Sequence, residues 1–281
     1  MFASDLLGGK VIIVTGGGSG LGLAMSKRFV SLGARVAIAG RSRDRLEAAA
    51  AEIDATGEHV YVHPTDVRDF AAVEALVEGT AARFGRLDAL VNNAAGNFLA
   101  TTEELSPNGF DAVVRTVLHG TFHATLAAGR KMIEAGGGDI LNIVTTYAWT
   151  GSAFVVPSAA AKAGVLALTR SLAVEWAAYG IRVNAIAPGP FPTEGAWSRL
   201  MPTAALEREA KARVPMGRFG QPDELANLAA FLLSDGARYI NGDCVTIDGG
   251  EWLASGGQFS GLRRLPRDEV KTLLQRMRGR A

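Results

Sequence analysis

The chain contains very little cysteine and no excess of charge of either sign. Cys244 is its only cysteine among 281 residues, which excludes an intramolecular disulfide and argues against a zinc cluster or other metal site. The 29 Lys and Arg against 28 Asp and Glu leave a net charge of +1, whereas nucleic-acid-binding domains are typically strongly basic. These absences predict a protein of a reducing, cytoplasmic compartment that does not bind nucleic acid.

Long apolar runs are also missing. No stretch is long enough to form a membrane-spanning helix, and the opening MFASDLLGGK has neither the charged start nor the apolar middle of a signal peptide. We therefore expect a soluble protein with no membrane partner. No low-complexity linker or break in composition divides the chain, so we expect one domain over residues 1–281.

Short β-branched apolar runs alternate with amphipathic segments. The runs are nearly continuously hydrophobic, as strands covered on both faces are, and they lie at residues 11–15, 35–39, 59–63, 89–93, 140–144, 182–187 and 244–248. Helical patterns follow at about residues 20–32, 43–54, 69–84, 108–134, 157–178 and 222–234. This alternation predicts an α/β fold with right-handed crossovers and a doubly wound parallel sheet.

Two segments do not fit the alternation. Residues 191–214 are interrupted by prolines and helical only in patches, which is typical of a lid. Residues 252–281 form a C-terminal tail ending in RRLPRDEVKTLLQRMRGRA. This tail is either a solvated amphipathic helix or a basic surface for a phosphate-rich ligand.

A glycine-rich loop, TGGGSGLG at residues 15–22, follows the first expected strand and opens the first helix. Its glycines permit a tight turn and close approach to a pyrophosphate, while the helix N-terminus supplies free N–H groups and partial positive charge. A plain turn would also use glycine, but the position between strand and helix favours dinucleotide binding. The candidate cofactor-binding residues here are Gly16, Gly17, Gly18, Ser19, Gly20 and Leu21.

The end of the second expected strand bears on which dinucleotide binds. A carboxylate at this position would hold an adenosine 2′-hydroxyl and repel a 2′-phosphate, but here Gly40 is followed by Arg41. Unless Arg41 merely faces solvent, this favours NADP(H) over NAD(H). After the third strand, Asp66 and the adjacent Val67 lie where an adenine amino group could be hydrogen-bonded.

Five motifs in this order resemble the short-chain dehydrogenase/reductase superfamily over almost the whole chain. They are TGGGSGLG, NNAAG at residues 92–96, Lys162, PGP at residues 188–190 and DGG at residues 248–250. The resemblance implies a Rossmann-like seven-stranded sheet, a nicotinamide cofactor and a homotetramer. It also implies that Asn93, Lys162, Pro188, Gly189, Pro190 and Phe191 contact the cofactor.

The chain departs from the usual Asn–Ser–Tyr–Lys set of that superfamily at two positions. Ser158 stands four residues before Lys162, where the tyrosine is expected, and Val117 stands where the asparagine usually falls. A serine hydroxyl is far too weak an acid to replace a phenol. Either the chemistry is lost, leaving an NADPH-binding scaffold, or the proton donor comes from another position.

Longer strings resemble one subgroup, the mitochondrial-type NADPH-dependent 2,4-dienoyl-CoA reductases. These strings are NNAAGNF, TTYAWTGSAFVVPSAAAKAG, PGPFPTEGAWSRL, ELANLAAFLLSD and GGQFSGLRRL. In that pattern the working tyrosine lies in the loop after the fifth strand, which is Tyr147 here. The resemblance implies that Tyr147 and Asn97 donate hydrogen bonds to the thioester oxygen of an acyl-CoA, with Lys162 on the nicotinamide ribose and Ser158 in support.

Substrate contacts also follow from the resemblance, at Arg68, Phe98, Ser106 and Arg199. Several alternatives remain open. Tyr147 can be an ordinary interface aromatic, Asn97 a turn-capping residue, and the arginines surface charges. The chain can also be a trans-2-enoyl-CoA reductase, or a 3-oxoacyl thioester or carbonyl reductase, although such a carbonyl reductase normally has a tyrosine at 158 and an asparagine at 117.

Overall fold

The sheet at the centre of the molecule has seven parallel strands. The computed structural model describes residues 2–193 and 203–279. The strands follow the order β3-β2-β1-β4-β5-β6-β7, and they are β1 (Val11–Thr15), β2 (Arg35–Gly40), β3 (Val60–Pro64), β4 (Ala89–Asn92), β5 (Gly138–Ile143), β6 (Ile181–Pro188) and β7 (Cys244–Ile247). The predicted doubly wound sheet is confirmed, with strand ends within about two residues of those expected.

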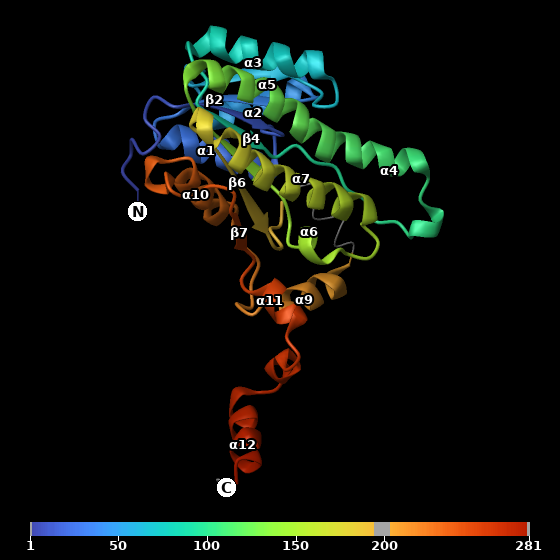
Figure 1. The fold of residues 1–281 in the computed structure, drawn as a ribbon. Helices are drawn as coiled ribbons and strands as arrows, with labels where there is room; N and C mark the ends of the chain where they lie inside the picture. Colours follow the sequence, from blue (N-terminus) through green and yellow to red (C-terminus); the bar gives the residue numbers. More distant parts are fainter. Residues whose placement is uncertain (1, 194–202, 280–281) are drawn as a thin grey trace.

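Helices cover both faces of this sheet (Figure 1). Helices α1 (Gly20–Ser31), α2 (Arg43–Ile53) and α10 (Pro222–Leu232) share one apolar core with the sheet. Helices α3 (Phe70–Phe84), α5 (Gly120–Ala135) and α7 (Val156–Glu175) cover the other face, and α4 (Pro107–Val114) extends from α5. Because both faces of the sheet are covered, its central strands are nearly continuously hydrophobic rather than alternating, and β1 is buried along its whole length.

The expected single helix over residues 108–134 contains a π turn. Residues Arg115–His119 form this turn between α4 and α5, and the backbone stays in the right-handed helical region on both sides of it. A π turn adds residues to one turn without changing the apolar pattern enough to be detected in the sequence. Val117, at the position of the missing asparagine, is fully buried in this turn.

A chain of buried side-chain hydrogen bonds ties β4 and β5 to the helices beneath them. Asn92 Nδ2 donates to Thr125 Oγ1 and to Asn142 Oδ1, both at 2.9 Å. Asn142 Nδ2 in turn donates to Thr169 Oγ1 at 2.8 Å. Since β4 and β5 pair from Ala89↔Asp139 to Asn92↔Asn142, this chain fixes the two strand ends that lead into the loops carrying Asn97 and Tyr147.

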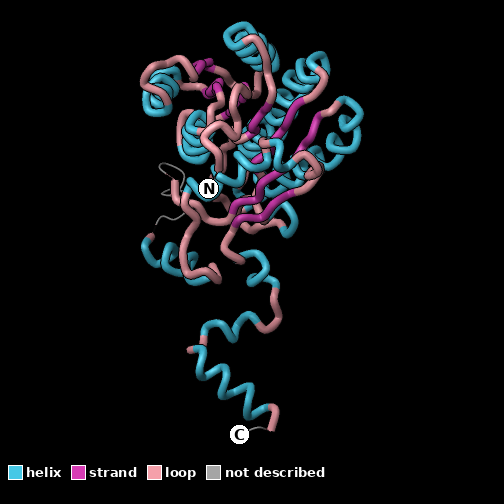
Figure 2. The backbone as a smooth tube through the Cα atoms, turned by 90° about the vertical axis from the view of Figure 1, so that its left-hand side faces the viewer, coloured by secondary structure: helices cyan, strands magenta, loops and turns pink. Residues whose placement is uncertain are grey.

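The described parts of the predicted lid and of the tail lie beyond the carboxyl ends of the strands (Figure 1). Residues 194–202 of the lid lie outside the described residues, and the rest of it ends in α9 (Ala204–Arg213). The tail begins with α11 (Glu251–Gly256), continues through a short 3₁₀ segment, η5 (Ser260–Arg264), and ends with α12 (Arg267–Met277). Figures 1 and 2 both show this tail projecting away from the α/β body. None of the described helices is long and apolar enough to cross a membrane.

Candidate active site

The glycine loop between β1 and α1 is packed so closely that side chains would not fit. A Cβ atom on Gly22 would lie 2.3 Å from the Gly16 carbonyl oxygen and 2.6 Å from Asn93 Nδ2. Gly16 and Gly20 have φ values of +68° and +54°, the left-handed region that favours glycine. Asn93 holds the loop from beneath, since its Nδ2 donates to the Thr15 carbonyl at 3.1 Å and to the Gly16 carbonyl at 3.3 Å.

The N-terminus of α1 fits a phosphate group. Ser19, the N-cap residue, makes no side-chain cap hydrogen bond, and the first turn carries no acidic residue. In contrast, Ser42, Asp69 and Ser106 cap the starts of α2, α3 and α4 with their side chains. The free N–H groups of α1 therefore point to an external anion, and with the tight glycine turn they fit the pyrophosphate of a dinucleotide.

Gly22→Ala is expected to destabilise the protein by about 3 kcal/mol and to weaken dinucleotide binding, because the loop must move to accept the methyl group. Thermal unfolding and fluorescence titration with NADPH measure the two effects. Gly261→Ala is the matched control, since a Cβ there meets nothing within 4 Å. Equal stability of the two variants would contradict the close packing described above.

The adenosine end of the predicted dinucleotide site contains Arg41, Asp66 and Arg68. Arg41 follows β2 directly and is exposed at the edge of the sheet. Arg68 donates to both carboxylate oxygens of Asp66, at 2.9 and 3.0 Å from its Nε, and this pairing holds the pKa of Asp66 below its usual value. Arg68, expected on the substrate side, is thus an ion-pair partner of the residue expected at the adenine.

Tyr147 and Ser158 are brought together across the site. Tyr147 begins α6 (Tyr147–Thr150), a single turn directly after β5, and its hydroxyl lies 3.0 Å from the Oγ of Ser158 on α7. Ser158 is buried, whereas Tyr147 is partly exposed. The phenol therefore reaches over the helix position from which the usual tyrosine would project, with the serine as its support.

Lys162 lies one helical turn after Ser158 on α7 and is only 7% exposed. Its Nζ donates a hydrogen bond to the carbonyl oxygen of Ile143 at the end of β5. Burial lowers the pKa of Lys162 to about 8, because the charged ammonium loses its hydration. Its charge is therefore readily changed near neutral pH.

Asn97 lies in the loop after β4, at the same sheet edge as Tyr147. Its Oδ1 accepts a hydrogen bond from the Phe98 N–H at 2.9 Å, and no residue in the described part of the chain accepts one from its Nδ2. A hydrogen bond from the Ala100 N–H to the Phe154 carbonyl oxygen, at 3.0 Å, joins this loop to the loop before α7. Asn97 thus lies in a loop that is bound to the segment between α6 and α7, and no hydrogen bond joins its side chain to that of Tyr147 among the described residues.

The remaining predicted residues are placed in different ways. Pro188 ends β6, and the Gly189 N–H donates a hydrogen bond to the Ile247 carbonyl oxygen at 2.9 Å. Phe191 is buried in the core, so only its backbone is available to a ligand. Ser106 caps α4 by accepting from the Gly109 N–H at 3.1 Å, and Phe98 is 41% exposed at the mouth of the site. Arg199 lies outside the described residues.

Two tryptophans support the tyrosine-bearing turn and were not singled out from the sequence. Trp149 on α6 stacks against Trp252 on α11, with ring centroids 5.1 Å apart. The backbone N–H of Trp252 donates a hydrogen bond to Asp248 Oδ2 at 2.7 Å. Trp149 lies inside one of the strings that resemble the subgroup and Trp252 lies two residues after the DGG motif, and these positions are the only signal in the sequence. The start of the tail is therefore coupled to the turn that carries Tyr147.

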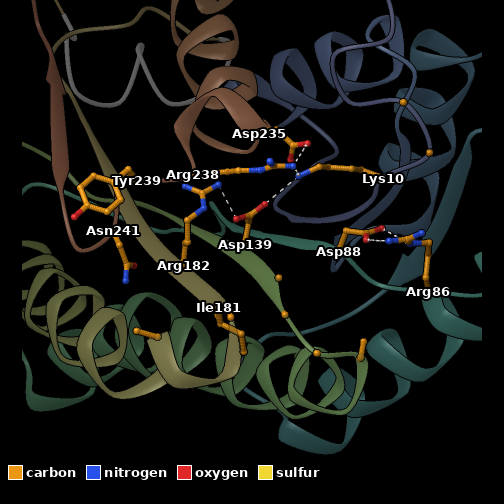
Figure 3. Close-up of a pocket in the computed structure, with 18 residues that line it drawn as sticks. Lys10, Arg86, Asp88, Asp139, Ile181, Arg182, Asp235, Arg238, Tyr239 and Asn241 are labelled. Atoms are coloured by element: carbon orange, nitrogen blue, oxygen red, sulfur yellow. Dashed lines mark hydrogen bonds and ion pairs between the residues drawn. The ribbon is translucent and has the colours of Figure 1, made fainter.

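A hollow at the opposite edge of the sheet does not contain these residues. It has a volume of about 880 Å³ and is lined by Lys10, Asp139, Arg182 and Asp235, among others (Figure 3). Its charges are paired with one another, since Asp139 lies 3.1 Å from Lys10 Nζ and 2.7 Å from Arg182 Nη2. Ligands of open parallel sheets bind at the carboxyl ends of the strands, so the candidate active site is the edge with Tyr147.

Sequence comparison assigns the chain to a family. The family described as enoyl-(acyl carrier protein) reductase matches residues 16–251. A probable 2,4-dienoyl-CoA reductase [(2E)-enoyl-CoA-producing] of Bacillus subtilis is 51% identical over 246 residues, which cover 87% of this chain and 97% of that protein. A probable 2,4-dienoyl-CoA reductase 3 [(3E)-enoyl-CoA-producing] of Caenorhabditis elegans is 43% identical, covering 91% of this chain and 84% of its own length.

Solved structures agree with this assignment. The crystal structure of a short chain dehydrogenase from Bacillus anthracis matches with a TM-score of 0.81 and 46% identity, covering 89% of this chain and 98% of that chain. The resemblance inferred from the motifs is therefore confirmed at the level of family and fold.

Proposed function

Because the chain belongs to the short-chain dehydrogenase/reductase family, whose members are oxidoreductases, we propose that it is an NADPH-dependent 2,4-dienoyl-CoA reductase that acts as a homotetramer. The observation that carries the proposal is the 3.0 Å contact between the Tyr147 hydroxyl and Ser158 Oγ. It gives the site a phenol although the usual helix position holds a serine. The relatives named as dienoyl-CoA reductases support the acyl-CoA substrate.

Reducing a conjugated thioester requires donors that are remote from the attacked carbon. When bound, NADPH supplies a hydride to the far end of the conjugated system. Negative charge then accumulates on the thioester oxygen, and hydrogen-bond donors already aimed at that oxygen can contribute about 3 kcal/mol each to the lowering of the barrier. Tyr147 and Asn97 are the two donors, and the last proton, on carbon, comes from water.

The hydrogen bond with Ser158 orients the hydroxyl group of Tyr147. If the Ser158 hydroxyl donates to the Tyr147 oxygen, the phenolic proton is free to point at the thioester oxygen. Lys162, with its Nζ at the end of β5, binds the ribose next to the nicotinamide and places positive charge beside the phenol. Asn97 contributes its Nδ2, because its Oδ1 is already occupied by the Phe98 N–H.

A three-substrate assay tests this function. NADPH absorbance is followed with 2,4-hexadienoyl-CoA, crotonyl-CoA and acetoacetyl-CoA in turn, and we expect oxidation with the dienoyl thioester. Preference for crotonyl-CoA would indicate an enoyl-CoA reductase, and preference for acetoacetyl-CoA a 3-oxoacyl reductase. Tight NADPH binding with no turnover of any of the three would indicate a non-catalytic dinucleotide-binding protein. The product double bond, which the names of the two relatives place differently, is identified by mass spectrometry and NMR of the product.

The preference for NADPH depends on Arg41 at the end of β2. Arg41→Ala is expected to weaken NADPH binding by roughly 10- to 100-fold, as expected for one lost hydrogen bond to a charged group, and to leave NADH binding unchanged. Dissociation constants from fluorescence titration give the result. Arg130→Ala, on the exposed part of α5, is the control and should change neither constant. Equal losses for both nucleotides in Arg41→Ala would show that Arg41 does not distinguish them.

A further inference from the structure

The C-terminal arm, residues 257–279, carries several apolar side chains that are largely exposed within the described part of the chain. Phe259 is 74% exposed, and both views show α12 away from the sheet and its helices (Figures 1 and 2). Helix α11, which directly precedes the arm, is attached to the body by the packing of Trp252 against Trp149. The arm therefore starts beside the active site and leads outward from it.

Helix α12 carries an apolar stripe on one side. Val270, Leu273, Leu274 and Met277 follow the spacing i, i+3, i+4 and i+7, which places them on one helix face. On this stripe Leu273 is 41% and Met277 75% exposed, whereas Val270 is buried. An isolated helix of 11 residues is only marginally stable in water, so α12 needs a partner surface for the exposed part of its stripe.

The charges of the chain are divided between arm and body. Residues 260–281 contain seven Lys and Arg and two Asp and Glu, which leaves the other residues with 22 basic and 26 acidic side chains. The basic segment thus has a net charge of +5 and the rest a net charge of −4. A second copy of this chain therefore offers the arm a surface of the complementary sign.

One apolar patch with acidic neighbours lies at the mouth of the active site. Its exposed side chains are Phe98 and Leu99 on one loop, Phe154 on a second loop and Val156 at the start of α7, and the Ala100–Phe154 hydrogen bond joins the two loops. Glu103 and Glu104, in the 3₁₀ turn η1 (Thr102–Glu104), are exposed directly after the first of these loops. The apolar stripe of α12, which is flanked by Lys and Arg side chains, is complementary to this patch in hydrophobicity and in charge.

We propose that the C-terminal arm docks on the active-site mouth of a second copy of this chain, with the α12 stripe on the apolar patch and its cations beside Glu103 and Glu104. The mouth of each site is then completed by a neighbouring subunit. Closed homo-oligomers commonly use such exchanged segments, because one surface serves every copy. This docking requires no assumption about the substrate.

Zero-length carbodiimide crosslinking tests the docking directly. Lys271, the lysine of α12, is expected to form an amide with Glu103 or Glu104 of another copy. Chains grown in ¹⁴N and ¹⁵N media are mixed and allowed to exchange subunits before crosslinking, so an intermolecular link joins a light to a heavy peptide in the mass spectrum. Crosslinks from Lys271 that join only peptides of one isotope, after complete subunit exchange, would overturn the proposal.

Hydrogen–deuterium exchange of the full chain gives an independent readout. In the assembled protein, α12 and residues 97–104 and 151–156 should exchange at least about tenfold more slowly than in Leu273→Asp. Gln275→Asp introduces the same charge on the opposite face of α12 and should keep wild-type protection. Rapid exchange of α12 in the assembled wild type, or protection of α12 that requires added phosphatidylglycerol vesicles, would contradict docking on a second copy.

Discussion

Tyr147→Phe is expected to lower kcat for 2,4-hexadienoyl-CoA at least about a hundredfold, because it removes one of the two donors to the thioester oxygen. The phenyl ring keeps the shape of the side chain and its packing on α6. NADPH affinity should therefore stay close to that of the wild type. Stopped-flow absorbance under single-turnover conditions separates the chemical step from product release.

Ser158→Ala is the matched control for the tyrosine. It removes the partner 3.0 Å from the Tyr147 hydroxyl but leaves the phenol in place, so a loss of only severalfold is expected, equivalent to one ordinary hydrogen bond of about 1 kcal/mol. If Ser158→Ala were as inactive as Tyr147→Phe, the serine would be a direct participant. Full activity of Tyr147→Phe would remove the tyrosine from the mechanism.

Lys162→Met is expected to abolish turnover and at the same time to stabilise the cofactor-free protein at neutral pH. Burial lowers the pKa of this lysine from 10.5 to about 8, so the folded protein bears a cost of about 3 kcal/mol for keeping it charged below pH 8. Methionine removes that cost but also the hydrogen bond to Ile143. A net gain of about 2 kcal/mol, or roughly 5 °C in Tm, follows.

The contribution of Lys162 to the free energy of unfolding changes with pH in a definite direction. Between about pH 8 and 10.5 the unfolded chain binds more protons at Lys162 than the folded protein does, so the lysine's contribution to stability rises with pH through this window. That rise should be absent from Lys162→Met. NADPH affinity of the wild type should fall as the pH rises through about 8, because the ammonium loses its charge. Chemical unfolding and ligand titration at several pH values measure both.

Lys10→Met is the control for this prediction. Lys10 lies at the opposite sheet edge, 3.1 Å from the Asp139 carboxylate, which is mostly buried. Removing it takes one cation from that carboxylate, so the variant should be less stable than the wild type but fully active. A Lys162→Met protein that was destabilised as well would show that the buried ammonium is favourable in the folded state.

The fold was largely predictable because its signals are local. Seven apolar runs and the amphipathic segments between them determined the strands, the crossovers and the face-covering helices to within a few residues. The π turn at Arg115–His119 was not predictable, since one widened turn changes the apolar period too little. The left-handed backbone conformation of Phe154, with a φ of +65°, was not predictable either. Its loop is joined by a hydrogen bond to the distant loop that contains Ala100.

Site residues could be proposed from the sequence where a motif or a resemblance pointed to them, but the contacts between their side chains could not. The glycine loop was predicted from its position between a strand and a helix, and the roles of Lys162 and Tyr147 were implied by resemblance. The stacking of Trp149 on Trp252, by contrast, joins residues about a hundred positions apart, and no local pattern specifies that contact. The pairing of Arg68 with Asp66 is local, between residues two positions apart, but the sequence does not show which way the Arg68 side chain turns.

The pairing of a phenol with an amide at the thioester oxygen is tested most directly by kcat/KM for 2,4-hexadienoyl-CoA in the double variant Tyr147→Phe/Asn97→Ala. With both donors removed, we expect a loss of about 10⁴-fold or more together with unchanged NADPH affinity. A double variant that retains a tenth or more of the wild-type value would contradict charge stabilisation by these two side chains.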